Sequence, residues 1–172
     1  MSLQAALLRG VNNVGARRVV MAELKALCER AGFTEVRTLL ASGNLVLGSK
    51  LKGAALEQKL EAEIEKALGL KTSVIVRSVA EMTAIVAANP FKGFAKRDPS
   101  HLLVFFMRAA PSTAEKAAME ANTGREKVKS GKGCLYITYP DGIGESKLKL
   151  PKVGTARNWN TVTKLAAMAA GE

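Results

Sequence analysis

The chain has 172 residues, of which 48% are hydrophobic and 24% charged, so it is long enough to bury a core as one domain or two small halves. This composition excludes long disordered stretches, and no apolar run approaches the roughly 20 residues that a membrane span needs. Lysine and arginine outnumber aspartate and glutamate by 26 to 15, and the net charge of +11 favours polyanionic partners.

The start of the chain lacks the basic and long apolar segments of a signal peptide, and the cysteines Cys28 and Cys134 form no CxxC motif. We therefore expect a cytoplasmic protein without a membrane anchor, in which both cysteines are plain buried thiols. Basic residues occur in both halves, with 12 Lys and Arg against 7 Asp and Glu in residues 1–77 and 14 against 8 in residues 78–172. Solubility alone is the alternative explanation for this charge.

The first half predicts alternating strands and helices. A strand is expected at residues 3–8, a helix from Met21 to a stop at Gly32, and a hairpin whose turn is Ser42-Gly43-Asn44. A stripe of apolar residues over 56–68, ending at Gly69, predicts a second helix, and residues 72–76 form a β-branched strand.

The second half repeats this order. A capping box at residues 78–81 opens a helix that Asn89-Pro90 stops, and residues 91–100 read as a link between the halves. A buried strand is expected at 101–107, a helix capped by residues 111–115, a hairpin over 125–139, a polar loop at 141–147 and a helix over 155–170.

Two β-α-β-β-α patterns predict an α+β fold with two ferredoxin-like subdomains and antiparallel sheets. We assign residues 1–77 to the first ferredoxin-like subdomain, 78–100 to a helix and linker, and 101–172 to the second subdomain with its C-terminal helix. No residue-by-residue repeat is visible, so the duplication depends on element order alone.

Five sequence blocks in a fixed order resemble the bacterial family known as domain of unknown function 1697. They are Ala6-Leu7-Leu8-Arg9-Gly10-Val11-Asn12, Met21-Ala22-Glu23-Leu24, Ser42-Gly43-Asn44-Leu45-Val46, residues 142–148, and residues 155–161. The resemblance implies an α+β fold of two similar subdomains. It implies no established activity, substrate or catalytic residue.

The segment from Thr155 to Lys164 carries the most distinctive polar residues, together with Trp159, the only tryptophan. If Thr155 caps the helix by accepting the amide of Asn158, Arg157 falls in the first turn, where a cation opposes the helix dipole. A ligand phosphate or a carboxylate of the protein could compensate Arg157. Trp159 is expected to face the core rather than a ligand.

The loop after the first strand offers Arg9, Asn12, Arg17 and Arg18 to phosphate oxygens, although it lacks the Lys-Ser/Thr pair of a P-loop. An irregular solvated connection is the alternative. Ser146 and Lys147, beside Asp141 and Glu145, could bind a ligand, but turn and cap duties explain that loop equally.

No catalytic residue can be assigned, because His101 lacks an obvious Ser or Cys partner. The pattern also indicates no metal site and no cofactor. Lys127, Lys129 and Lys132 line a hairpin and either guard an edge strand or follow a phosphate backbone.

We expect a basic protein that binds nucleic acid or another polyanion through phosphate contacts. Aromatic residues make up only 5% of the chain, and adjacent Phe105 and Phe106 point to opposite faces of a strand. Base-stacking recognition of single strands is therefore disfavoured, which leaves sequence-tolerant binding to a duplex or to the backbone. The alternatives are a site for a small anionic molecule, or an enzyme, at the junction of the two subdomains, and a scaffold for an acidic protein. The sequence leaves open whether the chain is an enzyme and which oligomeric state it adopts.

Overall fold

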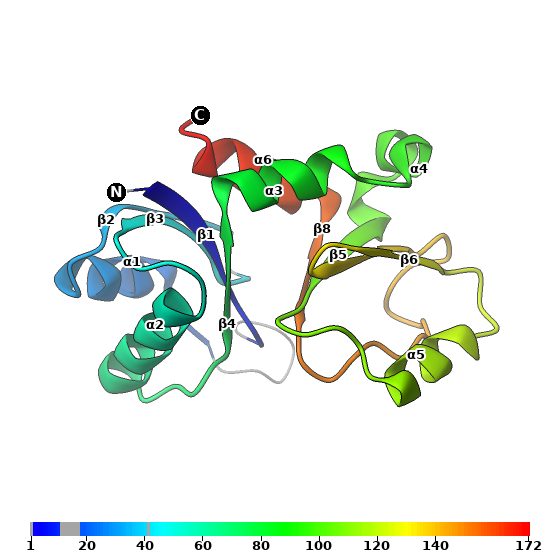
Figure 1. Ribbon diagram of the computed structural model, residues 1–172, viewed down its shortest axis with the longest axis horizontal. Coiled ribbons are helices and arrows are strands. Elements are labelled where there is room, and N and C mark those ends of the chain that lie inside the picture. The colour runs from blue at the N-terminus through cyan, green and yellow to red at the C-terminus, as the bar shows by residue number, and fades with distance from the viewer. Residues whose placement is uncertain (1, 11–17, 41) are drawn as a thin grey trace. The chain divides into compact units, whose positions relative to one another are not determined.

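The computed structural model describes residues 2–10, 18–40 and 42–172 (Figure 1). It divides into two compact units, the first comprising Met1–Ala84 and Lys164–Glu172 and the second Ile85–Thr163. The segment Lys164–Glu172 therefore groups with the first unit, whereas the sequence placed it in the second subdomain.

The first unit contains a four-stranded antiparallel sheet in the order β2-β3-β1-β4, which is the arrangement of a ferredoxin-like unit. Its elements are β1 (Ser2–Leu8), α1 (Met21–Arg30), β2 (Thr34–Leu39), β3 (Asn44–Ser49), α2 (Gly53–Leu68) and β4 (Val74–Ser78). The predicted strands and helices of this half are confirmed within a few residues at each end. Gly43 in the hairpin turn and Gly69 at the end of α2 both have positive φ, as the turn and the helix stop require.

Both helices pack on one face of this sheet, because apolar side chains recur along them at helical spacing. Leu24 and Leu27 of α1 and Leu56, Leu60 and Ile64 of α2 join one buried cluster with side chains from the strands. Among the residues that the structure describes, this cluster contains fifteen buried side chains. The first unit thus has a well-filled core.

Helix α2 also protects the edge strand β4. The backbone N–H groups of Val74 and Val76 donate to the carboxylates of Glu61 and Glu57, each at 2.8 Å. Four helical residues rise roughly 6 Å and two strand residues roughly 6.6 Å, so carboxylates one turn apart match alternate amides of the strand. These bonds satisfy donors that an edge strand would otherwise expose.

The second unit has the same sheet topology, in the order β6-β7-β5-β8. Its elements are α4 (Lys92–Arg97), η1 (Pro99–His101), β5 (Leu102–Phe106), α5 (Thr113–Glu120), β6 (Lys127–Gly131), β7 (Cys134–Thr138) and β8 (Thr155–Asn158). The predicted fold class, two ferredoxin-like subdomains with antiparallel sheets, is confirmed. In this unit, however, residues 139–154 form a loop where the first unit has helix α2.

Two helices cross the boundaries between the units, namely α3 (Val79–Ala87) and α6 (Trp159–Ala169). The predicted capping box of α3 is confirmed, because Glu81 N–H donates to Ser78 Oγ at 3.1 Å and Ser78 N–H donates to Glu81 Oε1 at 2.9 Å. Residues 91–100, expected to link the halves, contain the short helix α4 and the start of η1. The sequence did not predict these short helices, because two prolines and several charged residues are typical of a loop.

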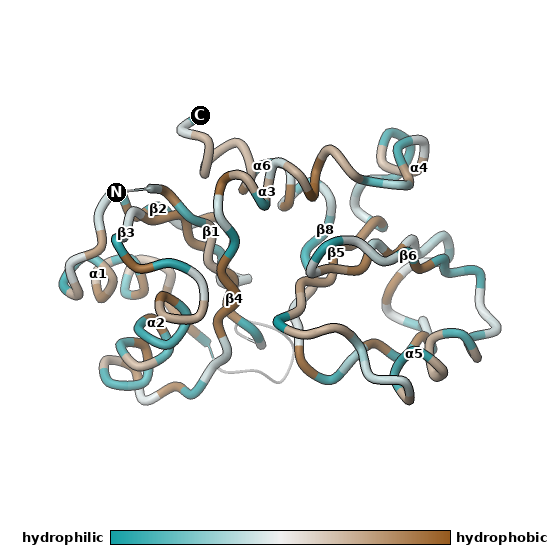
Figure 2. Tube along the Cα trace, in the orientation of Figure 1, coloured by the Kyte–Doolittle hydropathy of each residue, from teal (hydrophilic) through white to brown (hydrophobic). Residues whose placement is uncertain are grey.

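Strand β5 is buried on both faces. Leu103 and Phe105 belong to the cluster beneath the sheet, whereas Phe106, on the opposite face, is fully buried outside that cluster. The prediction that Phe105 and Phe106 point to opposite faces is confirmed. The apolar colour in Figure 2 follows β4 and β5 accordingly.

The prediction of one helix over residues 155–170 is wrong at its start. Thr155–Asn158 form strand β8, which pairs with β5 from Leu103 to Phe106, and the helix begins at Trp159. Asn158 caps it, because its Oδ1 accepts the N–H of Thr161 at 3.0 Å. Gly154 permits the approach of β8, since a Cβ there would lie 2.5 Å from two ring carbons of Phe105.

The two units share a buried arginine at equivalent positions. Arg77 of β4 pairs with the middle of β1 and Arg157 of β8 with the middle of β5. Each guanidinium Nη1 donates at 2.9 Å to the carbonyl of the preceding residue, Val76 or Ala156. Each strand then leads through a capping residue into a helix. The duplication therefore extends to side chains, which the sequence alone did not reveal.

Candidate functional site

The second unit carries a basic face formed by α4 and β6. The α4 part of this face comes from residues 91–97, with the sequence Phe-Lys-Gly-Phe-Ala-Lys-Arg. Two aromatic residues, three positions apart, are interspersed there with three cations. Asn89 Oδ1 accepts the N–H of Phe91 at 2.9 Å, which fixes the chain as it enters α4. Phe91 and Phe94 are half-buried and three residues apart, so they lie near one another on this short helix.

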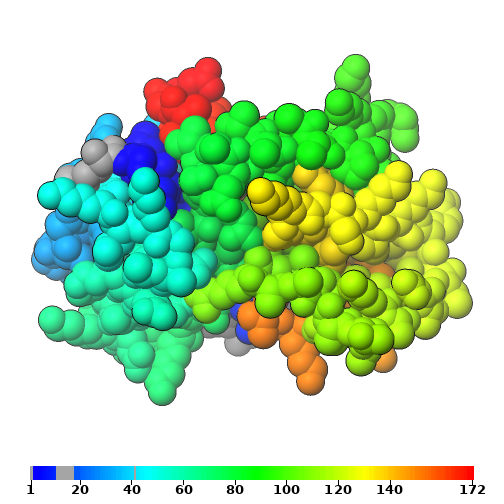
Figure 3. Space-filling model, viewed as in Figure 1, coloured from blue at the N-terminus to red at the C-terminus, as the bar shows by residue number. Residues whose placement is uncertain are grey.

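Strand β6 forms an edge of its sheet, as the pattern of its lysines predicted. Val128 packs on the core beneath the sheet, so Lys127 and Lys129 point to the opposite face. The Nζ atom of Lys129 lies 5.4 Å from the ring centroid of Phe91. In Figure 3 the yellow surface of β6 accordingly borders the green surface of the segment containing α4.

A cavity of about 670 Å³ opens on this face. It is lined by Phe91, Phe94, Arg97, Gly124, Arg125, Glu126, Lys127, Thr138 and Pro140. We name it the α4–β6 groove. Three cations, Arg97, Arg125 and Lys127, face one carboxylate, Glu126, so the lining carries a net charge of +2.

The acids near the groove are already engaged. Asp141 lies 3.3 Å from Arg125 in an exposed ion pair. Glu126 accepts the hydroxyl of Ser146 and, at 3.3 Å, the amide of Asn122, and these bonds hold the pKa of Glu126 below its usual value. Glu126 is therefore ionised at neutral pH, and the three cations still outnumber it. The groove can hold an anion whose apolar part contacts the phenylalanine rings.

Thr155, Arg157 and Asn158 do not form the predicted helix-terminus site, because all three lie within strand β8 and the helix begins only at Trp159. Arg157 is 6% exposed, and its Nη1 donates to Thr155 Oγ1 at 2.5 Å. Burial lowers the pKa of Arg157 to about 10, so the side chain remains charged at neutral pH. Trp159 is half-buried at the start of α6.

Ser146 and Lys147 lie in the loop 139–154. Ser146 donates its hydroxyl to Glu126, next to β6, whereas Arg157 lies on β8 at the other edge of the same sheet. Three strand spacings separate these edges by roughly 14 Å. The structure therefore does not bring Ser146 and Arg157 together.

Two predicted residues of the N-terminal loop are described. Arg9 and Arg18 are exposed, and the backbone of Arg9 bonds Ser73 O at 2.9 Å. Asn12 and Arg17 lie outside the described residues. A ligand site that includes this loop stays a prediction.

Two cysteines and His101 are the other candidate reactive groups that the structure describes. Cys28 and Cys134 are buried thiols, as predicted, and burial raises the pKa of Cys28 to about 12. His101 Nδ1 lies 2.7 Å from Asp98 Oδ2, while Ser100 bonds the other oxygen of Asp98 rather than the imidazole. Within the described ranges, no three His, Cys, Asp or Glu side chains gather to hold a metal ion. Of the helices that the structure describes, none is long and apolar enough to cross a membrane.

Sequence reasoning missed Phe91, Phe94 and Arg97. The signal was present, since two aromatic residues interleaved with three cations over seven positions resemble the composition of nucleic-acid binding surfaces. The pairing of α4 with β6, which are separated by about thirty residues, was visible only in the structure.

The structure is similar to that of the conserved bacterial protein SP0830 from Streptococcus pneumoniae. The two share 24% sequence identity with a TM-score of 0.80, and the match covers 98% of each chain. At this identity the likeness shows a common fold. No curated protein matches the sequence.

A family model matches residues 1–136, which is most of the chain. The match runs from β1 through β6 and ends within β7. Its description is "Protein of unknown function (DUF1697)". The chain therefore belongs to the DUF1697 family, as the five sequence blocks indicated.

Proposed function

We propose that this protein binds single-stranded nucleic acid, with the α4–β6 groove as the contact surface. The observation that carries the proposal is the placement of Phe91 and Phe94 among Arg97, Arg125 and Lys127 in one cavity. Cations that follow a phosphate backbone and rings on which bases stack are the two components of sequence-tolerant single-strand binding.

Several features support a single strand over a duplex. The rings lie inside a groove, where bases that are already paired and stacked would not reach them. Lys127 and Lys129 alternate along an edge strand, with a spacing of roughly 6.6 Å that resembles the repeat of an extended phosphate backbone. The net charge of +11 adds a long-range attraction that speeds encounter with any polyanion.

Fluorescence anisotropy with a labelled 12-nucleotide single strand, titrated over a series of salt concentrations, tests the proposal. Three phosphate contacts predict that the logarithm of the affinity falls against the logarithm of salt with a slope of about −2. Lys127→Gln and Arg97→Gln should each reduce the steepness by about 0.7. Phe94→Ala should weaken binding by about 1–3 kcal/mol at constant slope, because stacking releases no counterion.

Lys149→Gln is the matched control, since Lys149 is an exposed lysine of the same unit that does not line the groove. If Lys149→Gln reduces the slope as much as Lys127→Gln, binding is a property of the whole charged surface and the proposed groove is wrong. Absence of binding at 20 mM salt would remove the proposal altogether. A blunt duplex of the same sequence should bind more weakly and with no response to Phe94→Ala.

A further inference from the structure

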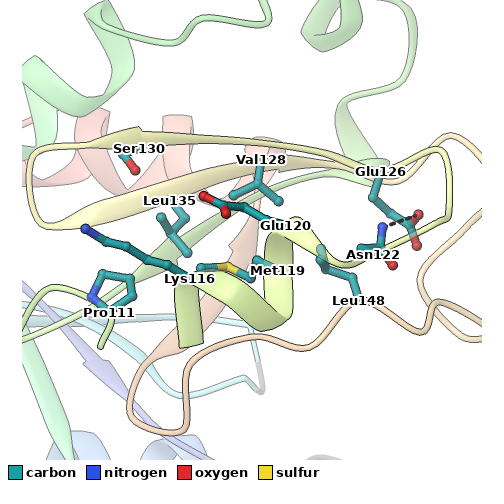
Figure 4. A pocket seen from close by; sticks show the side chains of 10 residues that line it. All are labelled: Pro111, Lys116, Met119, Glu120, Asn122, Glu126, Val128, Ser130, Leu135 and Leu148. Atoms are coloured by element: carbon teal, nitrogen blue, oxygen red, sulfur yellow. Dashed lines mark hydrogen bonds between the residues drawn. The ribbon is translucent and has the colours of Figure 1, made fainter. Parts of the chain in front are cut away.

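Helix α5 covers its sheet incompletely. None of its residues is fully buried, and Met119 contributes only a partly buried side chain to the core of the second unit. A cavity of about 460 Å³ separates this helix from β6 and β7. In Figure 4, Met119 lies below Val128 and Leu135, with the cavity bounded by these apolar side chains.

The charged groups at the two ends of this cavity have opposite signs, and the carboxylate of Glu120 lies between them. Figure 4 shows Lys116, Pro111 and Ser130 at one end and Asn122, Glu126 and Leu148 at the other. A neighbouring cavity of about 280 Å³ shares Lys116 and Ser130 with the first and adds Arg108. We call the two together the α5 trough. It is positive at the Arg108 and Lys116 end and negative at the Glu126 end.

This polarity differs from that of the rest of the surface. In a chain of net charge +11, the cavity under α5 is lined by one cation, Lys116, and two carboxylates, Glu120 and Glu126. The bonds from Ser146 and Asn122 keep the pKa of Glu126 low, so this end stays anionic at neutral pH. The α5 trough and the α4–β6 groove meet at Glu126, and their other charged residues differ.

The dimensions indicate the length of a ligand. Four residues separate Glu126, just before β6, from Ser130 within it, or roughly 13 Å of extended chain. An extended peptide of three or four residues spans a similar length. The side-chain amide of Asn122 and the hydroxyl of Ser130 can hydrogen-bond the peptide groups of such a ligand. An aliphatic ligand has no peptide groups and would leave these side chains without such bonds.

We propose that the α5 trough binds a short apolar peptide with free ends. Its ammonium group lies against Glu126, its aliphatic side chains contact Met119, Val128 and Leu135, and its carboxylate faces Lys116 and Arg108. The opposite charges at the two ends fix the direction of the peptide.

Two-dimensional amide NMR of the full chain, titrated with the tripeptide Ala-Leu-Ala, tests the proposal. Resonances of Met119, Val128 and Leu135 should shift on saturation. N-acetylation and C-amidation of the peptide should each weaken binding about tenfold, because each removes one charge-assisted contact.

Titrating each modified peptide against charge variants of the protein shows which end of the trough binds which end of the peptide. In Lys116→Gln, the effect of amidation should shrink while N-acetylation still costs about tenfold. In Glu126→Gln the effect of N-acetylation should be lost while amidation keeps its effect. Lys149→Gln and Glu145→Gln, exposed residues outside the trough, are the controls and should behave as the wild type.

Thermal unfolding of each variant verifies that the fold persists. Met119→Phe, which fills the space without changing a charge, should abolish the shifts. The proposal is overturned if saturating Ala-Leu-Ala shifts none of these resonances, or if the doubly capped peptide binds as tightly as the free one. Failure here leaves the nucleic-acid proposal standing, because single-strand binding is tested at Phe94, Arg97 and Lys127, which do not line the trough.

Discussion

The two units have one sheet topology but differ in how completely their cores are covered. In the first, α1 and α2 contribute five fully or nearly fully buried leucine and isoleucine side chains, and α2 also satisfies the edge of β4. In the second, α5 has no buried residue and a loop replaces the other helix. The described residues of its core cluster include six buried side chains, against fifteen in the first.

This difference in core coverage affects both stability and the space available for a ligand. A unit whose core is fully covered has little space for a ligand, whereas incomplete coverage leaves cavities beside exposed polar groups. All three cavities described above lie within the second unit. We infer that the first unit supplies more of the stability, and both surfaces proposed above lie on the second.

The largest expected effect comes from the apolar side chains with which α1 and α5 pack on their sheets. Leu24→Ala should lower the free energy of unfolding by about 3 kcal/mol, because a fully buried side chain leaves a cavity. Met119→Ala should cost about 1 kcal/mol, since Met119 is partly exposed and already borders a void. Urea denaturation measures both, and equal losses would contradict the comparison.

The close approach of β8 to β5 gives the second largest effect. Gly154→Ala should destabilise the protein by about 2 kcal/mol, because the new Cβ would meet the ring of Phe105 and, at 2.7 Å, the carbonyl oxygen of Phe106. Gly144→Ala, in the same loop but with no atom within 4 Å, is the control and should stay within about 0.5 kcal/mol of the wild type. A neutral Gly154→Ala would show that this packing is loose.

The protected edge of β4 can be opened selectively. Glu57→Ala removes the acceptor for the N–H of Val76 and should cost about 1.5 kcal/mol, because that donor lies in a buried position. Glu65→Ala on the same helix, an exposed residue whose nearest cation lies at 4.0 Å, should be nearly neutral. Hydrogen exchange of the Val76 amide should accelerate in Glu57→Ala and remain slow in Glu65→Ala.

The smallest effect concerns pH. Backbone N–H groups of Ser112 and Lys152 bond the Glu115 carboxylate and lower its pKa from 4.5. A carboxyl whose pKa is lowered by folding stabilises the protein above its unfolded pKa, and that stabilisation is lost as pH falls through the lower, folded value. Melting temperatures from pH 7 to pH 3 should therefore fall less steeply in Glu115→Gln than in the wild type.

Asp98 and Glu126 also have lowered pKa values, so Glu115→Gln should retain part of the acid sensitivity. A variant with the full acid dependence of the wild type would show that Glu115 contributes nothing to it.

Helix caps, turns and strand edges could be predicted from the sequence wherever a short residue pattern favours a single local structure. The capping boxes at Ser78 and Ser112, the left-handed stop at Gly69 and the edge lysines of β6 were all confirmed, because each depends on residues within a few positions or on one hairpin. The start of α6 was not, because Thr155 and Asn158 suit a cap or a strand equally. Pairing with β5, more than fifty residues away, decided in favour of the strand.

By itself the sequence determined the α+β class, the two ferredoxin-like sheets and the positive charge, since hydrophobic periodicity and composition act through neighbours along the chain. Only the tertiary structure decided that Arg157 repeats Arg77 as a buried strand residue, that Phe91 and Phe94 meet the lysines of β6, and that α5 leaves a cavity with opposite charges at its ends. These arrangements depend on contacts between segments far apart in sequence, whose geometry follows from packing and from strand register.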